Sequence, residues 1–370
     1  MRISFAVVML FFLLFSFGQL SAQQHFKVGI TQRAFEPEGP YNWRGAATHA
    51  LITSVWYPAD SRSIEKPQWV GPPNAPLFSA GDAAPDAKLA SGTFPLIVLS
   101  HGTGGSAGMM SWLGTALAAN GYIAAAVNHP GNNALESYTP QGFSLWWERA
   151  KDLSQVIDKM LGDSEFGARI DSSRIAAAGF SLGGYTMIEI AGGTTDRAAY
   201  RKFCDSRAAD DMCKSPPEFP QIMDYINRLD ATGRNDPEIA TSLQQEKEPH
   251  RDPRIRAVLA IAPALGPAFP PEGLKKIVIP VEIVAGIEDD SVPIKSSAEY
   301  LAAHISGAKL VLLKNGVQHY QFVASCTPAG RQKLPLLCTD GPGVNRDAIH
   351  KTTAAIAVAF FKAKLGTPRR

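Results

Sequence analysis

The chain of 370 residues carries 36 Lys and Arg against 34 Asp and Glu, which gives a formal net charge of +2. This balance, together with the lack of any run of basic residues, argues against a nucleic-acid partner. The length suits one large α/β domain with an insertion, or two small domains, and it is enough to bury a sizeable core.

Residues 1–22 are typical of a secretory signal peptide. Arg2 supplies a short positive region, residues 3–17 are mostly apolar, and Ser21 and Ala22 are small enough for cleavage. An uncleaved membrane anchor is the alternative, although the apolar run is shorter than a typical spanning helix. No other stretch is long and apolar enough to cross a bilayer, so we expect an exported mature chain over 23–370, periplasmic or secreted.

The four cysteines agree with export, because oxidising compartments favour disulfides. We expect two local bridges, Cys204 with Cys213 and Cys326 with Cys338, although four cysteines allow three pairings. Buried free thiols are the alternative. No spacing of Cys and His resembles a zinc site, and we expect neither a metal nor an organic cofactor.

The N-terminal part of the mature chain is predicted to form the edge of a sheet. Residues 25–35 and 51–57 alternate or cluster apolar side chains as strands do, and we expect them to pair antiparallel. Residues 58–92 are rich in Pro, Ala, Gly and Asp, a composition that predicts a loop over the surface.

From residue 94 onward, short apolar runs alternate with longer helical patterns. The expected strands are 94–100, 122–127, 175–178, 255–262, 281–285 and 309–313. The expected helices are 106–120, 145–161, the segment directly after residue 181, 294–305 and 348–365. Such alternation implies an α/β fold with a mostly parallel, doubly wound sheet and helices on both faces. Ligands of such sheets bind beyond the carboxyl ends of the strands.

Residues 192–253 interrupt this alternation. The segment is polar, holds two of the cysteines and has helix-like pieces at 220–229 and 237–247. We expect an inserted helical cap over the site, since lids of this kind exclude water and shape a substrate pocket. An irregular surface excursion is the alternative.

A G-x-S-x-G motif, residues 179–183 (GFSLG), joins a predicted strand to a predicted helix. The chain must reverse so tightly there that side chains at Gly179 and Gly183 would clash, and Ser181 must take a strained conformation. The turn presents the Ser181 hydroxyl and leaves the Leu182 N–H at a helix N-terminus. An ordinary glycine-rich turn is the alternative for the motif alone.

A serine hydroxyl needs a general base, and the base needs a carboxylate to hold it. His319 follows the last predicted strand, and Asp289 follows the strand before it. The chain order Ser181, Asp289, His319 is the α/β-hydrolase order and differs from the two main protease orders. Asp290 and Glu288 are the rivals of Asp289.

The oxyanion of a tetrahedral intermediate needs two N–H donors. We assign these to Leu182 and to Thr103, which lies in a glycine-rich loop directly after the strand at 94–100. His101 and His129 are expected to be structural and hydrogen-bonded near the site.

The core, from about residue 96 to residue 319, resembles the α/β-hydrolase superfamily. More narrowly, it is similar to bacterial proteins known as predicted dienelactone hydrolases and to platelet-activating-factor acetylhydrolase-like esterases. The matching segments are 55–58 (VWYP), 100–105 (SHGTGG), 125–129 (AAVNH), 179–184 (GFSLGG) and the loops of Asp289 and His319. The similarity implies the α/β-hydrolase fold and hydrolysis of esters with short acyl groups. Authentic dienelactone hydrolases use a cysteine where this chain has Ser181, so their activity is not implied.

These observations predict an exported serine esterase that acts on small-molecule or lipid-like esters through an acyl-enzyme. A peptidase or amidase and a polyester hydrolase would use the same triad. A catalytically inactive binding protein of this fold, or an acyltransferase, is a further alternative. The 192–253 insertion leaves the acyl and alcohol preferences open, and the sequence leaves the oligomeric state open.

Overall fold

The computed structural model describes residues 25–215 and 220–366. The predicted signal peptide therefore lies outside the described residues. Within them, no helix is both long and apolar enough to cross a membrane.

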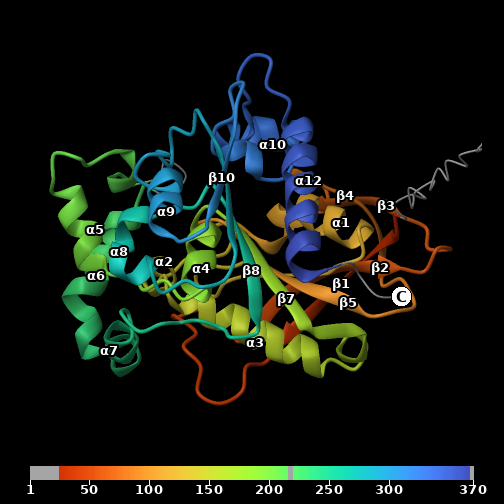
Figure 1. The fold of residues 1–370 in the computed structure, drawn as a ribbon, viewed down its shortest axis with the longest axis horizontal. Coiled ribbons are helices and arrows are strands. Elements are labelled where there is room, and N and C mark those ends of the chain that lie inside the picture. The colour runs from red at the N-terminus through yellow and green to blue at the C-terminus, as the bar shows by residue number, and fades with distance from the viewer. Residues whose placement is uncertain (1–24, 216–219, 367–370) are drawn as a thin grey trace, which may run out of the picture.

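Ten strands in the described chain form one sheet, with the spatial order β10-β9-β8-β7-β5-β6-β2-β1-β4-β3 (Figure 1). In chain order they are β1 (Lys27–Phe35), β2 (Leu51–Ala59), β3 (Lys66–Val70), β4 (Phe78–Pro85), β5 (Phe94–Ser100), β6 (Ile123–Val127), β7 (Ile170–Phe180), β8 (Ile255–Ile261), β9 (Val281–Gly286) and β10 (Lys309–Leu313). The strands from β10 to β6 are parallel, whereas β2 is antiparallel to both of its neighbours. The predicted mostly parallel sheet is confirmed.

Both faces of the central strands are buried, which explains their continuous apolar sequences. In β5, Leu96 and Val98 belong to one hydrophobic core, and Ile97 and Leu99 belong to the other. Helices α3, α4 and α9 cover the first face, whereas α1 and α12 cover the second (Figure 1). The helix bounds are α1 (Ser111–Ala119), α2 (Pro140–Ser144), α3 (Glu148–Gly162), α4 (Leu182–Ile190), α5 (Arg197–Cys204), α6 (Ile222–Thr232), α7 (Pro237–Gln244), α8 (Pro271–Leu274), α9 (Ala298–His304), α10 (Pro328–Lys333), α11 (Pro335–Cys338) and α12 (Arg346–Leu365).

The interpretation of residues 58–92 as a surface loop is wrong, because β3 and β4 lie there. Strand β4 pairs in parallel with β1, where Gly29 lies opposite Ala84, and it pairs antiparallel with β3. Phe78 and Ala83 are buried. The Ala-rich and Gly-containing sequence has low intrinsic strand propensity, so pairing with distant strands decides the structure. The helix expected at 294–305 is also shorter than predicted, because it begins only at Ala298.

The described residues 192–215 and 220–253 hold helices α5, α6 and α7, which gather at one end of the molecule (green in Figure 1). Helix α5 was not predicted, whereas α6 and α7 match the two helix-like pieces. The indole N–H of Trp147, just before α3, donates to the backbone carbonyl of Ser242 in α7 at 3.1 Å. The backbone N–H of Asp252 donates to the carbonyl of Ile190 at 3.2 Å, so the segment begins and ends at the same place.

Both expected disulfides are present. Cys204, the last residue of α5, is bonded to Cys213. Cys326 is bonded to Cys338, and this bridge encloses α10 together with α11. The described chain contains no free cysteine.

Candidate active site

Ser181 stands on the turn between β7 and α4, and its backbone has a φ of 56°. A Cβ at Gly179 would lie 2.3 Å from the Gly183 carbonyl oxygen, and a Cβ at Gly183 would lie 2.0 Å from that of Ser100. Both approaches are too close for any side chain, so the two glycines permit the turn. A positive φ combined with the Ser181 ψ of −117° is a strained backbone conformation for a residue other than glycine.

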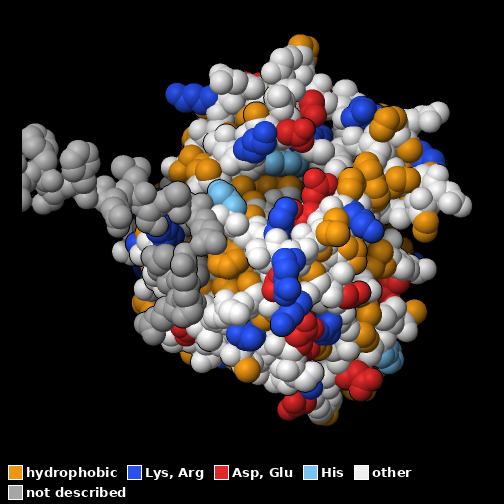
Figure 2. Space-filling model, turned by 90° about the vertical axis from the view of Figure 1, so that its right-hand side faces the viewer, with side chains coloured by type: hydrophobic (Ala, Val, Ile, Leu, Met, Phe, Trp, Pro, Cys, Tyr) orange, Lys and Arg blue, Asp and Glu red, His pale blue; other side chains and the backbone are white. Residues whose placement is uncertain are grey.

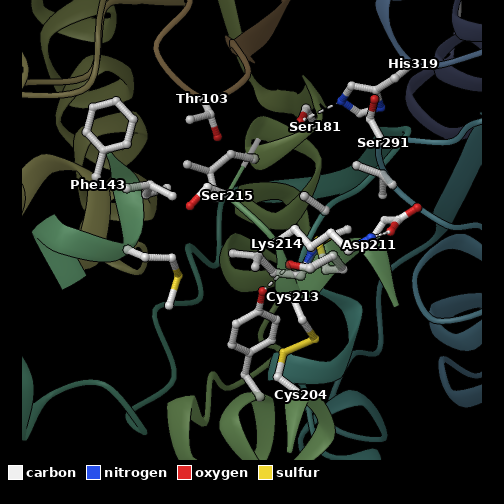
Figure 3. Close-up of a pocket in the computed structure, with 18 of the residues that line it drawn as sticks. Thr103, Phe143, Ser181, Cys204, Asp211, Cys213, Lys214, Ser215, Ser291 and His319 are labelled. Carbon is white, nitrogen blue, oxygen red and sulfur yellow. Dashed lines mark hydrogen bonds and ion pairs between the residues drawn. A yellow bond between two sulfur atoms is a disulfide. The ribbon is translucent and has the colours of Figure 1, made fainter. Parts of the chain in front are cut away.

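The structure brings Ser181, His319 and Asp289 together in one hydrogen-bonded chain. His319 Nε2 lies 2.9 Å from Ser181 Oγ, and His319 Nδ1 lies 2.8 Å from Asp289 Oδ2. Because the carboxylate accepts the Nδ1 proton, Nε2 is left free to accept the proton of the serine hydroxyl. Figure 3 shows Ser181 and His319 facing each other at one end of a cavity.

Asp289 is held more firmly than its two rivals. It is buried, and its Oδ1 accepts from the backbone N–H groups of Ser291 at 3.1 Å and Val292 at 2.7 Å. Asp290 and Glu288 are exposed. Within the described chain, their side chains accept from Ser291 and from the Gly316 N–H, respectively, and not from His319.

The two assigned oxyanion donors border the same cavity as Ser181. Leu182 is the first residue of α4. Thr103 follows Gly102, where a Cβ would lie 3.2 Å from that of Ser181, so the glycine-rich loop passes directly against the turn. Within the described residues, neither the Thr103 nor the Leu182 N–H donates a hydrogen bond to the protein. Both donors are therefore available to a bound oxygen atom.

The cavity beside Ser181 has a volume of about 730 Å³. Its walls come from the core and from the 192–253 segment, and they include Phe143, Trp146, Tyr200, Met212 and Ile226. The Cys204–Cys213 bridge lines the end opposite Ser181 (Figure 3). Figure 2 shows a hollow on one face of the molecule, bordered by hydrophobic side chains and by side chains of both charges.

Comparison with known proteins gives matches in sequence and in structure. Residues 80–144 match the family described as platelet-activating factor acetylhydrolase, isoform II. Across 95% of this chain and 93% of the other, the structure resembles a ferulic acid esterase from Streptomyces cinnamoneus, with a TM-score of 0.59 and 19% identity. The chain has the α/β-hydrolase fold. The similarity to α/β-hydrolases of the acetylhydrolase type, inferred from the motifs, is confirmed.

Two curated relatives share shorter stretches of sequence with the chain. Cutinase 2 of Thermobifida cellulosilytica is 30% identical over 109 residues, which are 29% of this chain and 38% of the relative. The bis(hydroxyethyl) terephthalate hydrolase of Streptomyces coelicolor is 27% identical over 114 residues, which are 31% of this chain and 34% of the relative. The chain thus spans between about a third and two fifths of the length of these relatives.

The described residues contain a second Ser–His–Asp chain, formed by Ser100, His129 and Asp152. Ser100 Oγ lies 2.8 Å from His129 Nε2, and His129 Nδ1 lies 2.7 Å from Asp152 Oδ2. All three side chains are fully buried, and none of them lines the cavity. Asp152 also accepts two hydrogen bonds from Arg44, at 2.8 and 2.9 Å.

The charges of this buried set are fixed by burial and by the two arginines near it. Burial, reinforced by the charge of Arg149, lowers the pKa of His129 to about 3, so the imidazole is neutral. Burial opposes the Asp152 charge, but the Arg44 guanidinium and the His129 hydrogen bond hold the pKa of Asp152 below its usual value.

Sequence reasoning placed His101 and His129 near the site but missed Arg149 and Asp152. A signal was present, because both charged residues fall on the face of α3 that also carries Leu153 and Val156. Charged side chains on the apolar face of an amphipathic helix indicate a buried polar cluster. Within the described residues, no group of three or more His, Cys, Asp and Glu is arranged to hold a metal ion.

Proposed function

We propose that the protein is an exported serine esterase whose nucleophile, base and acid are Ser181, His319 and Asp289. The observation that carries this proposal is the hydrogen-bonded chain of these three residues at the edge of a large cavity. In such a chain the carboxylate orients the imidazole and the imidazole accepts the proton of the serine hydroxyl, so the arrangement suits nucleophilic catalysis.

The mechanism follows from the geometry. Ser181 Oγ attacks an ester carbonyl while His319 Nε2 takes its proton, and the Leu182 and Thr103 N–H groups stabilise the oxyanion. His319 then donates the proton to the leaving alcohol, and the acyl group remains on Ser181. The same histidine next activates a water molecule, which hydrolyses the acyl-enzyme and restores the serine. Asp289 orients His319 and stabilises it while it is protonated.

Several observations support an ester as the substrate. The cutinases and the terephthalate hydrolase matched in sequence are named for esters, as is the ferulic acid esterase matched in structure. The cavity walls are mainly apolar, with Phe143, Trp146 and Met212 among them, which suits an uncharged acyl or alcohol group. In this proposal the 192–253 segment serves as the cap, and the two disulfides agree with export.

Cleavage of polyesters or their soluble fragments by the same triad is the second candidate function. It is favoured by the names of the curated relatives and by the rim of the cavity, where Met223 and Leu336 are more than two fifths exposed. Exposed apolar side chains at the mouth would contact a chain that extends beyond the cavity.

Hydrolysis of p-nitrophenyl esters, from acetate to longer acyl chains, tests the main proposal. Wild type should turn over a subset of the series, and Ser181→Ala and His319→Ala should lower kcat by at least about a thousandfold. The chain-length profile measures the acyl part of the cavity. A wild-type protein that hydrolyses none of the esters and does not react with a fluorophosphonate would contradict the proposal and favour a binding protein.

A further inference from the structure

Arg149 is a buried cation without an ion-pair partner in the described chain. It is the second residue of α3 and its side chain is 1% exposed, yet no carboxylate forms an ion pair with it. Arg44, the other buried guanidinium nearby, is in contrast paired with Asp152. Burying an unpaired charge is costly, and an aliphatic side chain would fill the same space without that cost.

The hydrogen bonds of Arg149 connect the two chain segments that carry the oxyanion donors. Its Nη2 donates to the His101 carbonyl and, at 3.3 Å, to Ser100 Oγ. Its Nε donates to Thr186 Oγ1 at 3.3 Å. Thr186 Oγ1 in turn donates to the Leu182 carbonyl at 2.9 Å. One rigid, planar guanidinium therefore contacts the start of the glycine-rich loop directly and reaches the first residue of α4 through the Thr186 hydroxyl.

The loop that follows His101 has a fixed peptide orientation. The Gly102 carbonyl accepts from His101 Nδ1 at 2.7 Å and from the Gly105 N–H at 3.2 Å. In a trans peptide the N–H of the next residue points away from that carbonyl. The Thr103 N–H is thereby directed away from the His101 ring, and Thr103 is one of the residues that line the cavity.

The His101 ring is itself held in one protonation state. The His129 backbone N–H donates to His101 Nε2 at 3.2 Å, which leaves Nδ1 as the protonated nitrogen. Burial and the neighbouring Arg149 charge lower the pKa of His101 well below its usual value, so that the ring remains neutral. Arg149 thus acts on the loop both by its bond to the His101 carbonyl and by its charge.

We propose that Arg149 is a positioning residue of the oxyanion site, an inference that rests on the proposed esterase function. It holds the His101–Thr103 loop and the start of α4 so that their two N–H donors converge. Its positive charge, buried behind both donors, also stabilises the negative charge that develops on the substrate oxygen. Such fixed charges are most effective where water is excluded.

The test compares Arg149→Met, Arg149→Lys and Arg174→Met with wild type on the best p-nitrophenyl ester. Arg174 is the control, because it is also buried and lies on β7, the strand that leads to Ser181, but it is seven residues before Ser181 and pairs with Asp171. Arg149→Met should lower kcat by about a hundredfold, the scale of losing one oxyanion donor, with KM changed by less than about threefold. Arg149→Lys keeps the positive charge but lacks the planar guanidinium. Its kcat should be about tenfold higher than that of Arg149→Met.

Affinity for a trifluoromethyl ketone gives a second readout, because the adduct of this inhibitor on Ser181 carries the oxyanion. This affinity should fall in parallel with kcat/KM in Arg149→Met and stay at the wild-type value in Arg174→Met. Thermal unfolding of each variant separates folding defects from catalytic ones.

Wild-type kcat and inhibitor affinity in a folded Arg149→Met protein would overturn the inference. If that variant does not fold, Arg149→Lys decides, since a wild-type kcat in Arg149→Lys would overturn the proposal that the planar guanidinium positions both segments. The wild-type rate and the fluorophosphonate labelling of Ser181 test the esterase proposal. The comparison of the Arg149 variants with wild type tests the role of Arg149, so the two proposals are contradicted by different measurements.

Discussion

The described residues hold two Ser–His–Asp chains of nearly equal geometry, whose serines lie at the carboxyl ends of the neighbouring strands β5 and β7. Ser181 and His319 line the cavity described above, whereas no residue of the other chain does. The distances are 2.9 and 2.8 Å in the chain that begins at Ser181, and 2.8 and 2.7 Å in the chain that begins at Ser100. Ser181 stands on a tight turn at the cavity, whereas Ser100 is the last residue of an extended, fully buried strand.

The difference teaches that hydrogen-bond geometry alone does not define a nucleophile. Attack also requires a path for the substrate and N–H donors for the oxyanion, and in this molecule both lie beside Ser181. The Ser100 hydroxyl donates to His129 and accepts from Arg149. Both hydrogen bonds are made to buried groups, so we expect this serine to stabilise the fold.

The largest expected contrast is between the two serines. Ser181→Ala should abolish turnover, as stated above, whereas Ser100→Ala should leave Ser181 reactive. Ser100→Ala removes the partner of two buried polar groups, so it should lower the free energy of unfolding by about 1–3 kcal/mol. Mass spectrometry after fluorophosphonate treatment, together with urea unfolding, measures both effects. A fluorophosphonate adduct on Ser100 in the folded wild type would contradict this account.

The next contrast lies between adjacent carboxylates. Asp289→Asn should lower kcat by about 10³–10⁴-fold, because an amide at this position favours the wrong tautomer of His319. Asp290→Asn changes an exposed side chain one position away and should keep kcat within about twofold. Steady-state kinetics on one ester distinguishes the two. The assignment of the acid would have to move to Asp290 if the effects were reversed.

The buried chain predicts a pH dependence of stability rather than of catalysis. The pKa of His129 is lowered to about 3 in the folded state, so between pH 3 and 6.5 the unfolded chain binds one more proton there. The stability that comes from keeping His129 neutral in the folded protein is present above pH 6.5. It is lost as the pH falls from 6.5 toward 3. Between pH 6.5 and 5 the loss should be about 2 kcal/mol.

Urea unfolding of wild type and His129→Gln at pH 5 and 6.5 isolates this effect. Burial raises the pKa of Glu189 to about 8, which gives the opposite slope, but that slope is common to both proteins. Wild type should therefore lose more stability than the variant on acidification. Equal losses in the two proteins would show that His129 is protonated in the folded state.

The smallest expected effect on catalysis concerns the bridge at the end of the cavity. Removing it with Cys204→Ser and Cys213→Ser together should lower the free energy of unfolding by about 2–3 kcal/mol, because it closes a short loop. Since this bridge lines the cavity and the Cys326–Cys338 bridge does not, KM should rise only in the first double variant. Kinetics and thermal unfolding of both double variants check this, and equal KM values would argue against a role of the Cys204–Cys213 bridge in shaping the cavity.

The central strands and the three proposed catalytic residues could be located from the sequence because their signals are local. Each parallel strand is a continuous apolar run, and Ser181 lies in a motif whose glycines are demanded by close backbone contacts. Asp289 and His319 follow from chain order at strand ends.

The parts that the sequence did not predict depend on contacts between distant segments. Strand β4 is too rich in small residues to be recognised alone and is stabilised by pairing with β1. Arg149 and Asp152 were missed because their partners, the His101 carbonyl and Arg44, are contributed by other parts of the chain. The role of buried charges is decided by these partners, and no local pattern encodes them.

The hydrogen bond from the Asp252 N–H to the Ile190 carbonyl has an evolutionary consequence. Because the chain leaves and re-enters the sheet layer at one point, residues between these positions can be inserted, deleted or exchanged while α4 and β8 keep their register. The helices that wall the far end of the cavity therefore form a replaceable module, and Ser181, Asp289 and His319 all lie outside it. Grafting a different helical segment between these two positions is therefore expected to change which molecules the cavity accepts while Ser181, Asp289 and His319 keep their positions.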